Sequence, residues 1–290
     1  MVLALDSARD RLAQALFSRV AGDEGPARRD RIHATAGPRW FGEDSAVRRV
    51  HGDASMFVGG IRALLLQSLH PLAMAAVAGH SGFRGDPWGR LQRTSTFLAT
   101  TTFGVAADAQ AAVDQVRAIH ARISGVSADG VPYAASDPHL LRWVHVAEAD
   151  SFLTAHQRYG ARPLDPAGCD QYVAEVAVVG RALGAAELPT TVAELAGSLE
   201  GYRAELRGTA EARQAARFLL MQPPLPLPLR PPYGVLASAA LGLMPRWTRW
   251  PLRLPYLPVA EATVGRAAGV LATSTIRWAL AEPPGSTTTG

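Results

Sequence analysis

An apolar helical run interrupted by a proline constrains this chain of 290 residues more than any other feature. Residues 55–78 are the most apolar helix candidate, and Pro71 lies inside them. Proline has no N–H to donate, and its ring clashes with the carbonyl four residues earlier. The helix must therefore kink or restart at Pro71. His70, at the break, is predicted either to cap a corner between two helices or to stand on a pocket wall.

The segment after the break contains a loop and then a second helix. Residues 80–89 hold three glycines and a proline, and Asp86 followed by Pro87 is a strong helix start. The helix is predicted to run over residues 87–103. Its polar face is either solvated or part of a binding site. The residues that share this face by helical spacing are Arg90, Arg93, Thr94, Phe97 and Thr101.

Two histidines lie on apolar stripes of the next two predicted helices. The first helix covers residues 106–124 and ends at Gly125, with His120 on the same stripe as Val116. The second runs from the cap at Asp137 to about residue 159 and carries His145 on its inner stripe. A histidine on an apolar stripe is more often a hydrogen-bonded core residue than a metal ligand. The residues alone leave both interpretations open.

The remaining segments also favour helices, because few runs alternate β-branched and polar residues. The chain is therefore predicted to be all-α, a single multi-helix domain over residues 1–290. Residues 42–52 are predicted to be a solvated lead-in. The other expected segments are helices over 3–20, 169–183, 190–207, 209–220, 233–244 and 260–280, a polyproline-like connector over 223–232 and a disordered tail over 282–290.

Composition limits the possible partners. The net charge is +4, and the arginines are scattered rather than clustered, which argues against nucleic-acid binding. The single cysteine allows no intrachain disulfide, and no signal-peptide pattern or clean transmembrane run is present. We therefore expect a cytoplasmic protein of undetermined oligomeric state. Residues 246–258 interleave Arg with Trp, Leu and Tyr, a weak indication of peripheral membrane contact.

Several common catalytic motifs are missing. The sequence has no GxxxxGK[ST] phosphate loop, no GxGxxG, no HExxH and no GxSxG. Nor do the eight histidines form a two-histidine, one-carboxylate iron site at any evident local spacing. An iron site formed in space by histidines and acids from distant segments is still possible.

An ordered series of short motifs resembles one family. LLLQxxHP ends at Pro71, HSGFxxDPxGR ends at Arg90, and RxxRT ends at Thr94. TTFG, VxxIHxxISG and DPxLLxWVH follow in the same order. Over roughly residues 35–240 the series resembles the family of latex-clearing proteins and MpaB-type oxygenases. The resemblance implies an all-helical fold and a b-type haem with one axial histidine.

The same resemblance implies roles for individual residues. His120 is the expected iron ligand, with His145 as a second candidate. Oxygen and an apolar, isoprenoid-like small molecule with a C=C bond would be the substrates. The residues expected to bind the haem are His120, Arg90, Thr94, Val116 and His70, and those expected to take part in catalysis are Arg90, Arg93 and Thr94.

Two departures from the family pattern argue against rubber as the substrate. Latex-clearing proteins have a lysine where this chain has Arg93, and arginine stays protonated and is a very poor metal ligand. Rubber-cleaving members also use a glutamate base upstream of the arginine, whereas residues 55–85 contain no acid. Two alternatives remain: a non-catalytic haem- or lipid-binding helical protein, and a metal-free interaction module.

Overall fold

The computed structural model describes residues 9, 14, 22, 24–80 and 86–281. Helices make up 69% of the chain, and the strands of the described residues form one two-stranded hairpin, so the predicted all-α class is confirmed. The helix predicted over residues 3–20 and the tail at 282–290 lie outside what the structure describes.

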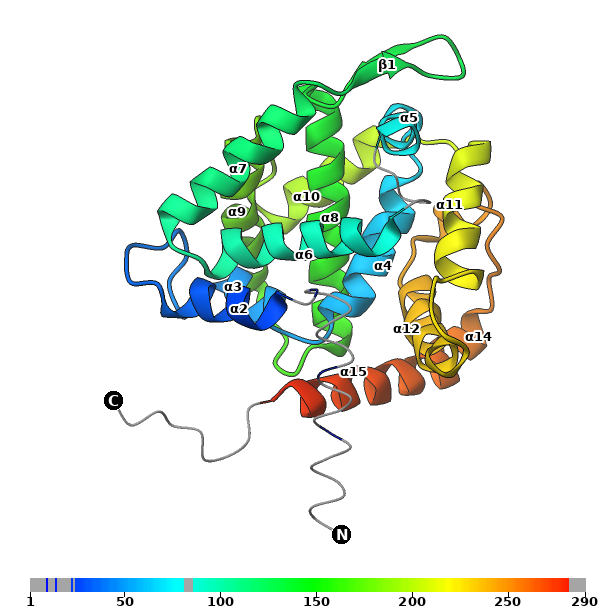
Figure 1. The fold of residues 1–290 in the computed structure, drawn as a ribbon. Helices are drawn as coiled ribbons and strands as arrows, with labels where there is room; N and C mark the ends of the chain where they lie inside the picture. Colours follow the sequence, from blue (N-terminus) through cyan, green and yellow to red (C-terminus); the bar gives the residue numbers. More distant parts are fainter. Residues whose placement is uncertain (1–8, 10–13, 15–21, 23, 81–85, 282–290) are drawn as a thin grey trace.

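Two helices replace the single apolar run, as the proline predicted. α4 (Met56–Gln67) ends just before His70, and α5 (Pro71–His80) leaves it at an angle of 106°. α4 packs along α8 (Pro138–Tyr159), which runs through the middle of the molecule (Figure 1). The approach is close because Gly59 of α4 has no side chain: a Cβ there would lie 2.7 Å from the ring of Phe152. The α4–α8 pair is the centre of the fold.

The buried residues of the α4–α8 pair include one charged group. Leu65 and Leu66 are fully buried beside Trp143 of α8. Arg62, only 3% exposed, donates a hydrogen bond to Ser151 at 2.7 Å and pairs with Asp150 at 2.7 Å. A buried guanidinium needs such a partner, because an unpaired charge in the interior is costly.

A second pair of helices is packed only at one end. The side chain of Asp86 caps α6 (Pro87–Phe103) by accepting from the N–H of Gly89 at 2.8 Å, as predicted. α6 and α7 (Ala106–His120) meet at a tight turn and then diverge (Figure 1). The buried residues lie near the turn: Thr101 and Thr102 in α6, Ala109 and Val113 in α7. The diverging halves, residues 87–100 and 114–120, contain no buried residue.

The prediction that a helix continues to Gly125 is wrong. α7 ends at His120, and the chain turns into a hairpin of β1 (Ser124–Val126) and β2 (Pro132–Ala134), in which Gly125 pairs with Tyr133. The tyrosine hydroxyl lies 2.7 Å from where a Cβ of Gly125 would be, so glycine suits close approach rather than a helix end. Between the two strands Gly130 has a positive φ of 78°.

Two other segments differ from the prediction. Residues 42–52 are not a solvated lead-in, because α3 (Ala46–His51) buries Val47 and Val50 and turns its arginines to the other face. Residues 223–232 are not wholly extended: residues 227–229 form a 3-10 turn, and the two prolines that follow occupy the first turn of a helix, where proline is tolerated.

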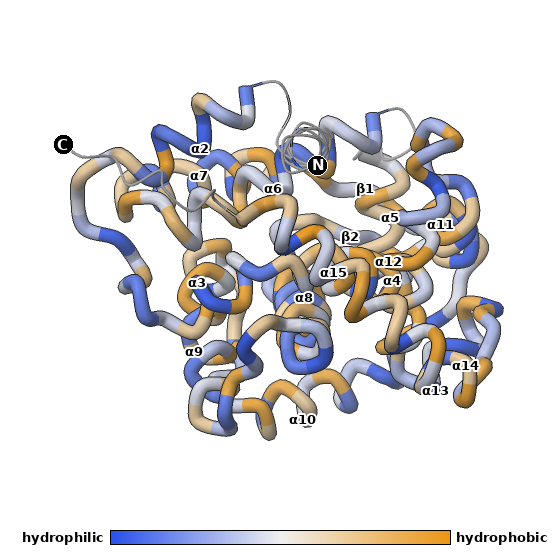
Figure 2. The backbone as a smooth tube through the Cα atoms, turned by 90° about the horizontal axis from the view of Figure 1, so that it is seen from below, coloured by the Kyte–Doolittle hydropathy of each residue, from blue (hydrophilic) through white to orange (hydrophobic). Residues whose placement is uncertain are grey.

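The remaining elements surround this centre. In Figure 2, α12 lies beside α4, and both are coloured mainly as hydrophobic. These elements are α2 (Gly25–Ala34), α9 (Pro166–Leu183), α10 (Val192–Tyr202), α11 (Ala210–Met221), η1 (Leu227–Leu229), α12 (Arg230–Gly242), α13 (Arg246–Arg249), α14 (Pro258–Ala260), η2 (Glu261–Gly265) and α15 (Arg266–Leu280).

Within the described part of the chain, no one helix has the length and apolar character needed to cross a membrane. By length and composition alone, α4 and α5 taken together as a bent pair pass the same test.

Candidate functional site

The expected iron ligand is the last residue of α7. His120 is half-buried, and burial lowers the pKa of its imidazole. Its Nδ1 is buried and has no hydrogen-bond partner among the described residues. Val116, one turn earlier on the same stripe, is also half-buried. A neutral imidazole with an available nitrogen is the form that binds iron.

The three residues expected on α6 lie in the half that diverges from α7. Arg90 is half-buried, and burial, with a smaller contribution from Arg93, lowers the pKa of its guanidinium. Thr94 is exposed. Arg93 is 66% exposed and pairs with Asp86 at 3.3 Å. Arg93 therefore contacts the cap at the start of its own helix.

The second histidine candidate lies on α8 near an acid. His145 packs against Gly180 of α9, and burial lowers its pKa to about 4. Its Nε2 is buried, and the described part of the chain offers it no hydrogen-bond partner. Glu148 is three residues further along the same face. Burial raises the pKa of Glu148 to about 7, and no hydrogen bond to it is found among the described residues. Asp150, two residues further on, pairs with Arg62 instead.

A buried histidine that the sequence did not single out joins three helices. His51 of α3 lies 2.8 Å from the hydroxyl of Thr102 on α6 and 3.3 Å from that of Tyr172 on α9. Burial lowers the pKa of His51 to about 3, so its ring is neutral. These contacts close the packed end of the α6–α7 pair.

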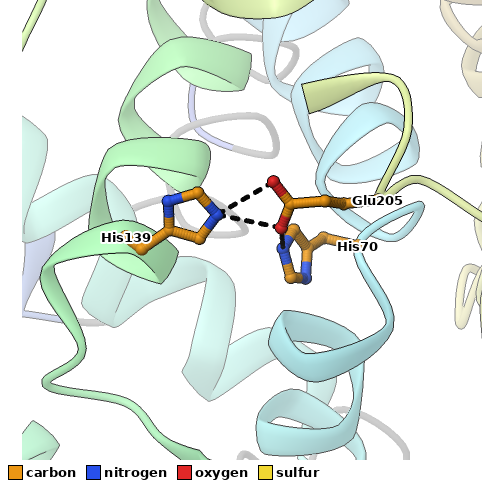
Figure 3. Close-up of side chains that lie close together, drawn as sticks. All are labelled: His70, His139 and Glu205. Carbon is orange, nitrogen blue, oxygen red and sulfur yellow. Dashed lines mark hydrogen bonds and ion pairs between the residues drawn. The ribbon is translucent and has the colours of Figure 1, made fainter. Parts of the chain in front are cut away.

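His70 belongs to a separate cluster (Figure 3). It sits at the α4–α5 corner, with its ring buried and its Nε2 3.3 Å from Oε2 of Glu205. Nε2 of His139 lies 2.9 and 3.0 Å from the two carboxylate oxygens of Glu205. One ligand atom from each of the three side chains lies within 4.8 Å of the others. Burial lowers the pKa of His70, and Glu205 opposes that shift.

Hydrogen bonds fix the three segments that carry this cluster. The N–H of Arg207, two residues after Glu205, donates to the carbonyl of Leu69 at 2.8 Å. Trp143 of α8 donates from its indole to the carbonyl of Gln67 at 3.2 Å. The hydroxyl of Tyr202 donates to the carbonyl of His139 at 2.8 Å. Hydrogen bonds to backbone carbonyls therefore hold together the α4–α5 corner, the start of α8 and the turn after α10.

A cavity of about 630 Å³ opens beside the cluster. His139 and Glu205, whose side chains are 52% and 42% exposed, lie on its wall, while His70 is behind them. The other wall residues come from α8, α10 and the segment before α10. They are Arg142, Glu187, Leu188, Pro189, Thr190, Glu194, Gly197, Ser198, Gly201 and Tyr202.

The structure gives His70 partners that the sequence did not indicate. His70, expected near the haem, contacts Glu205 and His139, and no interaction found in the described residues joins it to His120 or to α6. Sequence reasoning missed His139 and Glu205 as partners. They lie 69 and 135 residues after His70, and no local spacing connects them.

Residues 48–274 match the family described as ER-bound oxygenase mpaB/B'/Rubber oxygenase, catalytic domain. The chain belongs to this family. The suspected resemblance is confirmed, and the family is an oxygenase catalytic domain, which suggests a metal or haem cofactor. No curated protein and no solved structure matched the chain.

Proposed function

We propose that this chain is a haem b-dependent oxygenase that uses O₂ to attack a C=C bond of an apolar, isoprenoid-like small molecule. The observation that carries the proposal is the unburied, diverging halves of α6 and α7 within a protein of the oxygenase family. Three residues that the family resemblance implicates, Arg90, Thr94 and His120, all lie in these halves and not among the buried core residues.

The residues present fit a haem. Each candidate ligand has one buried ring nitrogen without a hydrogen-bond partner among the described residues, Nδ1 in His120 and Nε2 in His145. We favour His120 because it ends the half of α7 that contains no buried residue, whereas His145 packs against Gly180 of α9. Arg90 and Arg93 would offer positive charge to the haem propionates, and Val116 an apolar contact.

When bound, haem b supplies a redox-active iron for dioxygen chemistry. The chain's own residues hold the apolar substrate, exclude water and manage protons. Arg90 and Thr94 of α6 would contact the bound haem or substrate, and Arg93 stays a further candidate for this role. Glu148, with its pKa near 7, can hold or release a proton at its carboxylate close to neutral pH. It is the acid that we propose in place of the family glutamate absent from residues 55–85.

We further propose that the described elements form one domain. The two core clusters share Leu199 as a packed neighbour. α12 packs on α4 and α15 on α8, so the C-terminal helices contact the same centre as the family core.

The absorption spectrum of purified, haem-reconstituted protein tests the cofactor. We expect a Soret band that is lost in His120→Ala and kept in His145→Ala, the matched control on the neighbouring helix. The absence of a Soret band in the wild type would contradict the haem proposal. Loss in His145→Ala alone would move the ligand to α8.

Oxygen uptake with an isoprenoid alkene then tests turnover. We expect uptake by the haem-loaded wild type and its loss in Arg90→Ala when the rate is divided by the amount of bound haem. Haem binding without any uptake would instead support the non-catalytic binding protein.

A further inference from the structure

We propose that His70, His139 and Glu205 form a second metal site, for a divalent first-row transition metal such as Zn²⁺ or Fe²⁺. The site is separate from the proposed haem. It takes its ligands from the α4–α5 corner, the first turn of α8 and the turn after α10.

The distances suit shared coordination. Zn²⁺ binds imidazole nitrogen and carboxylate oxygen at about 2.0–2.2 Å, which places neighbouring ligand atoms about 3–3.5 Å apart. The carboxylate of Glu205 lies 2.9 Å from Nε2 of His139 and 3.3 Å from Nε2 of His70. A metal ion could therefore bind with only small movements of the side chains (Figure 3).

The hydrogen bonds around His139 leave its Nε2 free to bind a metal. Because the hydroxyl of Tyr202 donates to the carbonyl of His139, its lone pairs face Nδ1 of the same residue, 3.4 Å away. Nδ1 is then the protonated nitrogen, and Nε2 points its lone pair at Glu205. A lone pair facing a carboxylate at 2.9 Å is repulsive unless a positive charge lies between them. A metal ion, or a second proton, supplies that charge.

The surroundings resemble a prepared site more than a chance surface contact. The backbone hydrogen bond between Arg207 and Leu69 and the indole bond from Trp143 hold the ligand segments independently of the cluster. The rings of Trp143 and Tyr202 pack around the two histidines, with centroids 4.8 to 6.3 Å apart. Rigid support of this kind orders ligands before the metal binds.

The ligand number also leaves room for chemistry. Two histidines and one carboxylate, with remaining positions open, are the donor set of catalytic zinc sites and of non-haem iron oxygenases. His139 and Glu205 both line the cavity of about 630 Å³, so the open positions would face space large enough for a small molecule.

Metal titration of the full-length, chelator-treated protein tests the site. Zn²⁺, and Fe²⁺ under anaerobic conditions, are added separately, and bound metal is counted by mass spectrometry after desalting. We expect one equivalent beyond any haem iron. The relative affinities distinguish the two metals, and a high-spin nitrosyl EPR signal of the Fe²⁺ form would show an open position.

Glu205→Gln provides the decisive variant, because it keeps the shape and removes the carboxylate. Loss of a partner outside the coordination shell already costs about 10- to 100-fold in affinity, so loss of this ligand should cost at least as much. Glu187→Gln is the matched control: it alters an acid of the same cavity that pairs with Arg142, and affinity should not change. His139→Asn provides a second, half-exposed ligand variant.

Two results would overturn the proposal. One is a wild type that retains no metal after desalting. The other is that the Glu205→Gln variant and the His139→Asn variant each bind the metal as tightly as the wild type does. The test is independent of the proposed function, because the site uses neither His120 nor α6. The Soret band should be unchanged in Glu205→Gln.

Discussion

The α4–α8 pair and the α6–α7 pair represent two ways in which helices can meet. α4 and α8 touch along their length around Gly59, and they bury leucines, a tryptophan and an ion pair. α6 and α7 bury residues only near their connecting turn, and residues 87–100 and 114–120 contain no buried residue. The first pair resembles a scaffold whose stability comes from packing. The second leaves every side chain of residues 87–100 and 114–120 at least partly exposed.

The largest expected effect comes from breaking the buried ion pair of the α4–α8 region. Arg62→Ala leaves Asp150, which is 21% exposed, without its partner. Removing one member of a buried pair typically costs about 3–5 kcal/mol in the free energy of unfolding. Urea denaturation measures it. Arg142→Ala is the control, because its partner Glu187 is 83% exposed and such pairs contribute about 0–1 kcal/mol. Equal losses of unfolding free energy in both variants would contradict the distinction between a buried and an exposed ion pair.

Two neighbouring glycines of α4 test the close helix contact. Gly59→Ala would place a Cβ 2.7 Å from Phe152, and overpacking of this kind costs about 1–3 kcal/mol. At Gly60 a Cβ meets nothing within 4 Å, so Gly60→Ala should stabilise the helix by up to about 1 kcal/mol. Thermal unfolding followed by circular dichroism should show shifts of opposite sign. Shifts of the same sign would mean that α4 and α8 are not in close contact at Gly59.

Glu148 allows a pH-dependent test of burial on the face of α8 that carries His145. Its folded pKa of about 7 lies above the ordinary 4.5, so the unfolded chain ionises first and stability falls as pH rises between these values. Glu148→Gln removes that fall. The variant should match the wild type near pH 4 and exceed it at pH 7 by an amount on the order of 1–3 kcal/mol.

Denaturation at a series of pH values gives the difference curve for Glu148→Gln. Glu200→Gln, an exposed acid on α10, is the control and should give a flat difference. A flat curve for Glu148→Gln as well would place that carboxylate in water rather than in the interior.

The smallest expected effect is at Arg93. Its side chain is 66% exposed and pairs with Asp86, so Arg93→Lys should change stability by less than about 0.5 kcal/mol. We expect the spectrum of the haem-loaded protein to stay unchanged between about pH 6 and 10, the range in which a perturbed lysine titrates. A shift toward a six-coordinate, low-spin spectrum at high pH would instead bring residue 93 to the iron.

Local signals account for the parts of the fold that sequence predicted well. Asp86 and Asp137, each followed by proline, mark the starts of α6 and α8, and Thr191 marks the start of α10. Pro71 locates the break between α4 and α5. Each of these depends on backbone chemistry within a few residues, which a sequence displays directly.

Other parts depend on contacts that a sequence does not display. Val47 and Val50 are buried although charged residues surround them in the chain, because α3 turns one face to the core. Gly125 pairs in a strand because Tyr133 folds back onto it. Glu205 meets His70 only because the turn after α10 is bonded to the α4–α5 corner. The cluster therefore could not be predicted from spacing.

The packing of α4 on α8 has a consequence during synthesis. About 70 residues separate the end of α4 from the start of α8, so the ribosome releases the apolar α4 well before its partner exists. Chains emerge at about 5–20 residues per second, and exposed apolar segments aggregate or recruit chaperones in the meantime. The centre of the fold can thus form only after more than half of the chain has been synthesised. Production of the protein should depend on chaperone supply more than its finished stability suggests.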